Sequence, residues 1–92
     1  MRNETRVVNL HHDRYDVNIM RPGKWGNPFP IVEGAVTREM SIVSHARWIR
    51  TQPHLMTMIQ TELKGRVLGC CCKPKPCHGD TLAAIANGEV GA

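Results

Sequence analysis

The sequence has few aromatic residues and no long apolar run. Its 92 residues include one Phe, one Tyr and two Trp, so only 4% are aromatic. No stretch reaches the roughly 18 apolar residues that a membrane-spanning helix needs. The N-terminus is charged and leads into a short apolar patch, which is not the pattern of a signal peptide. We therefore expect a cytoplasmic protein that does not engage a membrane.

The sequence also lacks the motifs of several common site classes. It contains no GxGxxG, GxxxxGK[ST] or HExxH motif and no Ser-His-Asp arrangement. These absences argue against a Rossmann dinucleotide site, a P-loop, a zinc-protease helix and a serine-hydrolase triad. Any chemistry must therefore be read from less common patterns.

Length, charge and cysteine content narrow the alternatives. We expect one domain over residues 1–92, with its core at about 6–88. Twelve Lys and Arg against eight Asp and Glu give a net charge of +4. That balance is compatible with nucleic acid, a phosphate-bearing ligand or an acidic protein partner. In the cytoplasm the four cysteines stay reduced, so they are expected to be metal ligands or reactive thiols.

Three segments have the composition of β-strands. Residues 6–10 are rich in β-branched side chains, and residues 15–20 alternate polar and apolar positions. Residues 66–72 form an apolar run without alternation, which predicts an interior strand. Between the second and third strands, residues 21–30 hold three prolines and two glycines, which excludes regular structure there.

Three helices are predicted around these strands. Thr37 is a suitable N-cap for a first helix that ends before Pro53, and Pro53 suits the first turn of a second helix ending at Lys64-Gly65. A third helix is expected over about 80–86. The predicted fold class is α/β, with a small single-layer sheet of about three strands packed with about three helices.

The segment 70–80 connects the third strand to the last helix. In α/β sheets, ligands gather where strands end and helices present unpaired N–H groups. Its CxC-x4-CH pattern offers three sulfurs and one imidazole, a donor set suited to tetrahedral zinc. A zinc site would use the side chains of Cys70, Cys72, Cys77 and His78.

Two other interpretations of this segment stay open. The cysteines can pack as small apolar side chains around a site for an organic ligand. Alternatively, Cys77 is a reactive thiol, because His78, Lys75 and the following helix N-terminus all favour a thiolate. Asp80 is either a partner of His78 in proton transfer or simply the N-cap of the helix.

The loop 21–29 is the second candidate for a ligand site. Arg21 and Lys24 could hold phosphate, Trp25 could stack on a base, and Asn27 could contact a ligand. Alternatively, Trp25 and Phe29 fill a core that is otherwise poor in aromatic residues.

The remaining histidines give weaker signals. His11 and His12 form a pair in a predicted turn, and a metal or catalytic role for them is the minority interpretation. His45 and His54 are expected at solvated positions of the first two helices.

Several motifs together resemble a known family. They are Tyr-Asp-Val at 15–17, the loop Arg-Pro-Gly-Lys-Trp-Gly-Asn-Pro-Phe at 21–29, Trp48, and the segment 68–80. In combination they are similar to a group of short phage and bacterial proteins grouped as a domain of unknown function, over about residues 6–88. That group usually has Trp at the position of Cys71, so Cys71 is the least functional of the cysteines. The resemblance implies a phage or prophage origin and a shared site, and it supplies no reaction.

The carboxyl-terminal motif is also similar to a second uncharacterised α/β family. In that family a strand ending in cysteine leads to Cys-His-Arg before a helix. Gly79 stands here in place of the arginine, so the resemblance does not carry an anion-binding role to this position.

The leading hypothesis is a nucleotide- or nucleic-acid-directed protein whose two loops converge on one site. Whether it is an enzyme that processes a nucleotide or base stays open. Arg21 and Lys24 would hold phosphate, while His78 and Asp80, with Cys77, would perform catalysis. The expected lining is Arg21, Lys24, Asn27, Cys72, Cys77, His78 and Asp80.

Two further hypotheses remain beside it. One is a zinc-stabilised, non-catalytic module that binds a host protein in the host cytoplasm, and the other is a redox-active thiol protein. Either a monomer or a homodimer is compatible with the sequence, since methionines at helical spacing could extend an apolar face.

Overall fold

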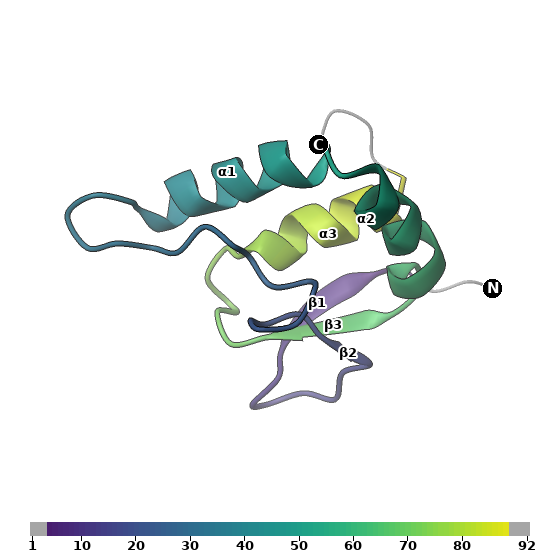
Figure 1. Cartoon of the computed structure of the whole chain (residues 1–92). Coiled ribbons are helices and arrows are strands. Elements are labelled where there is room, and N and C mark those ends of the chain that lie inside the picture. Colours follow the sequence, from purple (N-terminus) through teal and green to yellow (C-terminus); the bar gives the residue numbers. More distant parts are fainter. Residues whose placement is uncertain (1–3, 89–92) are drawn as a thin grey trace.

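The computed structural model describes residues 4–88. Its elements follow the predicted order of strand, strand, helix, helix, strand, helix (Figure 1). They are β1 (Arg6–Asn9), β2 (Val17–Asn18), α1 (Arg38–Ile49), α2 (Pro53–Met58), η1 (Ile59–Leu63), β3 (Val67–Cys70) and α3 (His78–Ala86). The α/β class is therefore confirmed.

The three strands form one parallel sheet in the order β1-β3-β2. Val7 pairs with Leu68 on one side of β3, and Val17 pairs with the same residue on the other side. The predicted interior strand is thus the central one, which agrees with its run of apolar residues. Because all strands run in one direction, β2 and β3 release the chain at the same edge of the sheet.

The helices lie together on one face of this sheet (Figure 1). Leu68 and Cys70 of β3 point toward them and are almost fully buried. Gly69 points to the opposite face, where a side chain would collide with Tyr15 and Leu10 of the segment between β1 and β2. That segment therefore covers the second face of the sheet, and Gly69 permits its close approach.

The strands are shorter than predicted, and β2 shows why. Only Val17 and Asn18 pair as a strand within the predicted span 15–20. The Asn18 side-chain oxygen accepts a hydrogen bond from the Met20 amide at 2.9 Å, so the chain turns away at once. Composition does not detect this turn, because alternation continues through it.

The helix boundaries agree with local sequence signals in most places. Thr37 caps α1 and accepts a hydrogen bond from the Met40 amide. The predicted second helix begins as α2 at Pro53, but its later part is the π-helix η1. The spacing of apolar residues does not distinguish an α-helix from a π-helix here, because buried Ile59 and Leu63 are compatible with both.

Two positions differ from the predictions. His45 was expected in solvent and is 1% exposed, because α1 packs on α3 through this side of the helix. The last helix begins earlier than predicted, with Cys77 as its N-cap, so Asp80 stands in the first turn at N3 and not at the N-cap. No helix within residues 4–88 is long and apolar enough to cross a bilayer.

The two ends of the described chain are joined. Thr5 donates its amide to the Asn87 side chain at 2.8 Å, and the Asn87 side-chain amide donates to the Thr5 carbonyl at 2.9 Å. The buried Thr5 hydroxyl also donates to the Leu63 carbonyl and accepts from the Gly65 amide. The edge strand and the end of α3 are thereby held to the turn before β3.

Candidate functional site

A pocket of about 240 Å³ lies at the carboxyl edge of β2 and β3, beneath the start of α1. Ligands commonly bind at this edge of an α/β sheet. Both predicted loops reach it. The pocket is lined by Met20, Arg21, Asn27, Phe29, Pro30, Ile31, Arg38, Ser41, Ile42, Cys70, Cys71, Cys72, Pro76, Cys77 and His78.

His78 ties the two loops together. Its Nε2 lies 2.9 Å from the carbonyl oxygens of both Ile19 and Trp25. A carbonyl only accepts, so Nε2 must carry the proton, and this fixes the tautomer of a neutral ring. Burial lowers the pKa of His78 despite these two contacts. His78 therefore holds the wall of the pocket through Nε2, which leaves only Nδ1 for any proton exchange.

Asn27 attaches the first loop to α1. Its side chain donates to the Ser41 hydroxyl at 2.9 Å and accepts from the Phe29 amide at 2.8 Å. The Ser41 hydroxyl in turn donates to the Phe29 carbonyl. Ser41 is buried, so this network sets the position of Asn27, Phe29 and Pro30 in the pocket lining.

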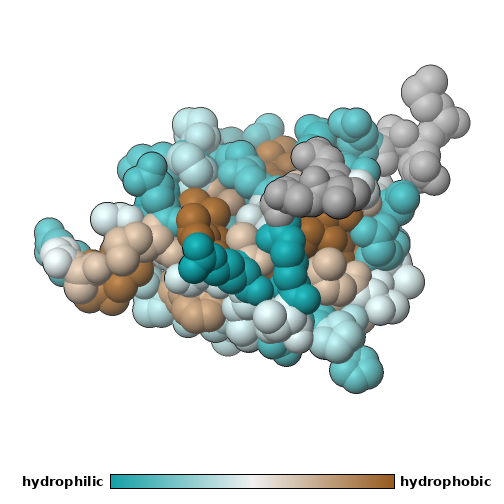
Figure 2. All heavy atoms as spheres, turned by 90° about the horizontal axis from the view of Figure 1, so that it is seen from above, coloured by the Kyte–Doolittle hydropathy of each residue, from teal (hydrophilic) through white to brown (hydrophobic). Residues whose placement is uncertain are grey.

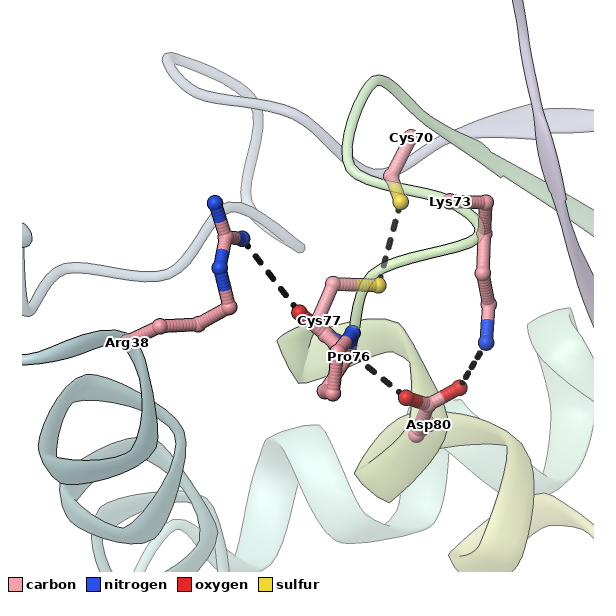
Figure 3. Close-up of polar contacts among 6 residues, drawn as sticks. All are labelled: Arg38, Cys70, Lys73, Pro76, Cys77 and Asp80. Atoms are coloured by element: carbon pink, nitrogen blue, oxygen red, sulfur yellow. Dashed lines mark hydrogen bonds and ion pairs between the residues drawn. The ribbon is translucent and has the colours of Figure 1, made fainter.

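Two arginines supply the charge of the pocket. Arg21 follows β2, and Arg38 reaches from the first turn of α1 to the Pro76 carbonyl at 3.3 Å (Figure 3). Its guanidinium also contacts the Cys72 thiol, whose pKa burial nevertheless raises. No Asp or Glu belongs to the lining formed by the described residues. The pocket is therefore cationic.

Cys70 and Cys77 face each other at the wall of the pocket. Their sulfurs are 3.0 Å apart, with Cys70 at the end of β3 and Cys77 at the start of α3 (Figure 3). The hydrogen bond from Cys77, with help from the amides of Cys72 and Lys73, lowers the pKa of Cys70 to about 5 although burial opposes this. The same pairing and burial raise the pKa of Cys77.

The acidity of these two thiols is the reverse of the expectation from sequence. Cys77 was expected to be the thiolate because it adjoins His78 and a helix N-terminus. Either sulfur can donate in the contact between them, but the pKa of Cys70 is lowered and that of Cys77 is raised. The thiolate form is favoured at Cys70 because the backbone amides of the turn after β3 stabilise a negative charge on its sulfur.

Asp80 stands beside the pocket and not in it. One carboxylate oxygen accepts from the Cys77 amide at 3.2 Å, and the other pairs with Lys73 at 2.6 Å (Figure 3). The Cys77 sulfur accepts from the backbone at the same helix start, which completes a capping box. The contacts of Asp80 are those of a helix cap.

Lys24 and Trp25 also lie outside the pocket lining. The Lys24 ammonium pairs with Glu62 at 2.8 Å and lies 5.5 Å from the centre of the Trp25 ring. Trp25 is 5% exposed and belongs to the apolar core. The interpretation of Trp25 as a core residue is thus the one that its burial supports. Phe29, in contrast, lines the pocket and packs edge-on against Trp48.

Sequence reasoning missed the contribution of α1. Arg38, Ser41 and Ile42 line the pocket, but no motif marks them. The one available signal is the Thr37 N-cap, which places Arg38 at the start of a helix. Its proximity to Pro76, 38 residues later, depends on tertiary packing.

The candidate zinc ligands do not come together as a set. Within residues 4–88, no cluster of three or more His, Cys, Asp or Glu side chains is arranged to hold a metal ion. His78 Nε2 faces carbonyl oxygens, and Cys71 is exposed. Of the predicted ligands, only Cys70 and Cys77 share a direct contact.

Exposed apolar side chains gather on the loop before α1 and on α1 itself, near the pocket. Large exposed apolar side chains include Ile31, Val32, Met40 and Val43. In Figure 2, which looks onto the helical layer, brown and tan surface gathers where the loop before α1 projects at the left. Further brown surface shows near the middle of this face, between teal side chains.

Comparison with known proteins identifies relatives. The chain is 42% identical over 90 residues to a phage T4 protein described as "Uncharacterized 12.4 kDa protein in nrdA-td intergenic region". The alignment covers 89% of this chain and 77% of the T4 protein. No solved structure matches. The family description "Domain of unknown function (DUF4326)" matches residues 3–88. The resemblance to a phage and bacterial family is thereby confirmed: the chain belongs to the DUF4326 family.

Proposed function

We propose that the pocket binds a phosphate-bearing small molecule of the nucleotide class. The observation that carries this proposal is the pair Arg21 and Arg38 lining a pocket to which no described carboxylate contributes. Guanidinium groups bind phosphate through paired, charge-assisted hydrogen bonds. Such a pocket favours an anion over a neutral or cationic ligand.

The remaining lining residues suit the base and sugar of a nucleotide. Met20, Phe29, Ile31 and Ile42 provide apolar contacts for a base or sugar, while Asn27 and Ser41 provide polar ones. The volume of about 240 Å³ is small for a ligand site. It accommodates a single nucleotide-sized group better than a strand of nucleic acid, so a free nucleotide is the preferred ligand class.

The test is calorimetric titration of the full chain with nucleoside mono-, di- and triphosphates, the parent nucleosides and inorganic phosphate. Replacing Arg21 and Arg38 together with Ala should weaken nucleotide binding by about 100-fold or more, since each charge-assisted contact contributes roughly 1.5–3 kcal/mol. Lys24→Ala is the matched control. It also removes a cation, but one that pairs with Glu62 outside the pocket, and affinity should change by less than about twofold.

Thermal unfolding of each variant separates lost binding from lost structure. The proposal is wrong if no nucleotide binds the wild-type chain. It is also wrong if the double variant, still folded, binds as tightly as the wild type. Equal weakening by Lys24→Ala would show a general charge effect and no specific pocket.

A further inference from the structure

Cys70 and Cys77 form a close pair of free thiols that the proposed nucleotide site does not use. Their sulfurs are 3.0 Å apart, and both belong to the pocket lining. A disulfide bond is about 2.05 Å long, so closing the pair requires the sulfurs to move together by about 1 Å. The residues come from the end of β3 and the start of α3, and the turn between them sets their approach (Figure 3).

The surroundings of the two sulfurs differ, and they suit Cys70 as the nucleophile and Cys77 as the thiol that reacts second. The Cys70 sulfur contacts that of Cys77, and this contact, together with the backbone amides of the turn after β3, lowers the pKa of Cys70. Cys77 stands at the N-cap of α3, where its hydrogen bond with Cys70 and its burial raise its pKa. Cys70 is thereby prepared as a nucleophile, while Cys77 keeps its proton until a second step.

The other two cysteines are placed less favourably. Cys71 is exposed and does not belong to the apolar core. Cys72 is half-buried and contacts Arg38. Among the described residues, neither Cys71 nor Cys72 has a second sulfur within contact distance. The 3.0 Å approach is found between Cys70 and Cys77.

We propose that Cys70 and Cys77 are a redox-active dithiol that reduces a small hydroperoxide and closes into a disulfide. The size of the oxidant follows from burial, because Cys70 is 1% and Cys77 3% exposed. A bulky organic disulfide could not approach either sulfur in line, whereas hydrogen peroxide can enter from the pocket. This inference does not rest on nucleotide binding, although both use the same pocket.

The chemistry balances in two steps. The Cys70 thiolate attacks one peroxide oxygen, the O–O bond breaks, and Cys70 becomes a sulfenic acid while the departing hydroxide takes up a proton to form water. The Cys77 sulfur then attacks the Cys70 sulfur, and the S–O bond breaks. The hydroxyl leaves with the Cys77 proton as a second water. Two electrons pass from the sulfurs to the peroxide, and an external dithiol returns them.

The experiment uses the full chain and a Cys71→Ser/Cys72→Ser variant that retains only the proposed pair. Each is reduced, desalted and treated with an equimolar amount of hydrogen peroxide at neutral pH. Both should lose two hydrogens in mass and two alkylatable thiols, and peptide mapping should find a Cys70–Cys77 crosslink. Dithiothreitol should restore both thiols.

Single variants assign the two roles. In Cys77→Ser the reaction should stop at a sulfenic acid on Cys70 that a 1,3-dione probe such as dimedone labels. In Cys70→Ser the same probe should label Cys77 at most weakly. The backbone amides that favour a thiolate surround position 70 and not position 77. Equal or stronger labelling of Cys77 would overturn the assignment of the nucleophile.

Three other results would overturn the dithiol itself. One is a crosslink or oxidation confined to Cys71 or Cys72 in the full chain. Another is a Cys71→Ser/Cys72→Ser variant whose two thiols remain alkylatable after peroxide and denaturation. The third is about one zinc ion per purified chain that must be removed before peroxide reacts, which would make the sulfurs metal ligands.

Discussion

Gly79 is a residue at which the absence of a side chain matters for packing. A methyl group placed there would lie 2.6 Å from the Ile19 Cδ1 atom and 3.1 Å from a Val7 methyl. Ile19 is fully buried and has little freedom to withdraw. The first turn of α3 therefore packs on β1 and on Ile19, just after β2, without strain when this position is Gly. An arginine side chain has no room at this position.

Gly79→Ala should accordingly lower the free energy of unfolding by about 1–3 kcal/mol, the usual cost of overpacking a core. The effect should appear although Ala is intrinsically the better helix former. Urea denaturation followed by circular dichroism provides the measurement.

Ile19→Val supplies the control for this prediction, because it deletes the atom that collides. Alone it should cost about 0.5–1.5 kcal/mol. In the double variant the loss should be smaller than the sum of the single losses. Strict additivity would show that the contact with Ile19 is not the cause.

At the scale of elements, the start of α3 determines how the pocket is built. Cys77 at the N-cap and Asp80 at N3 satisfy each other's backbone groups, and Lys73 pairs with the outer carboxylate oxygen. This arrangement fixes the turn that carries Cys77 and His78 into the pocket wall. The contacts of Asp80 are thus those of a positioning residue, and its predicted catalytic role stays a prediction.

Asp80→Ala should lower the free energy of unfolding by about 0.5–2 kcal/mol, as expected for the loss of a cap. Asp80→Asn should cost less, because an amide oxygen can still accept from the Cys77 backbone. Nucleotide affinity of the Asn variant should stay within about twofold of wild type in the same calorimetric titration. A folded Asn variant that loses all binding would instead place Asp80 in contact with the ligand.

At the scale of the whole molecule, α1 and α3 meet through two buried histidines. The rings of His45 and His78 are 5.0 Å apart. His45 Nδ1 is buried and has no hydrogen-bond partner among the described residues. Burial, together with His78 and Arg50, lowers the pKa of His45 from its ordinary value of 6.5 to about 4. The fold therefore requires a neutral ring between the helices.

This requirement predicts a loss of stability in acid. Between pH 6.5 and 4 the unfolded chain binds a proton at His45 that the folded chain does not, so the free energy of unfolding falls as the pH falls. The contribution of His45 amounts to roughly 3 kcal/mol over this range. Above pH 6.5 it is constant. Denaturant titrations at intervals from pH 7 to 4 measure the slope.

His45→Leu should flatten this slope, because the titrating group is gone. Cys70 and His78, whose pKa values are also lowered, reduce stability in the same direction as pH falls, and both are present in the two proteins. The difference between the two slopes therefore reports His45 together with its coupling to His78. Identical slopes would mean that His45 is protonated in the fold as readily as in the unfolded chain.

The sequence by itself determined the features that depend on neighbouring residues. Prolines and glycines set the two loops, Thr37 set the start of α1, and Asn87-Gly88 set the end of α3, where Gly88 has a positive φ of 83°. The apolar run before Cys70 indicated the central strand. These signals are local, since a cap, a turn or a buried strand is decided by a few consecutive side chains.

Only the tertiary structure decided which of the candidate residues share a site. It placed β3 between β1 and β2, brought Arg38 to the loop before α3, turned Lys24 toward Glu62, buried His45, and set Cys70 against Cys77. Each of these outcomes depends on how helices pack on the sheet and not on the residues adjacent in the chain. The type of a side chain limits the chemistry that it can perform, but the packing of distant segments determines which groups it contacts.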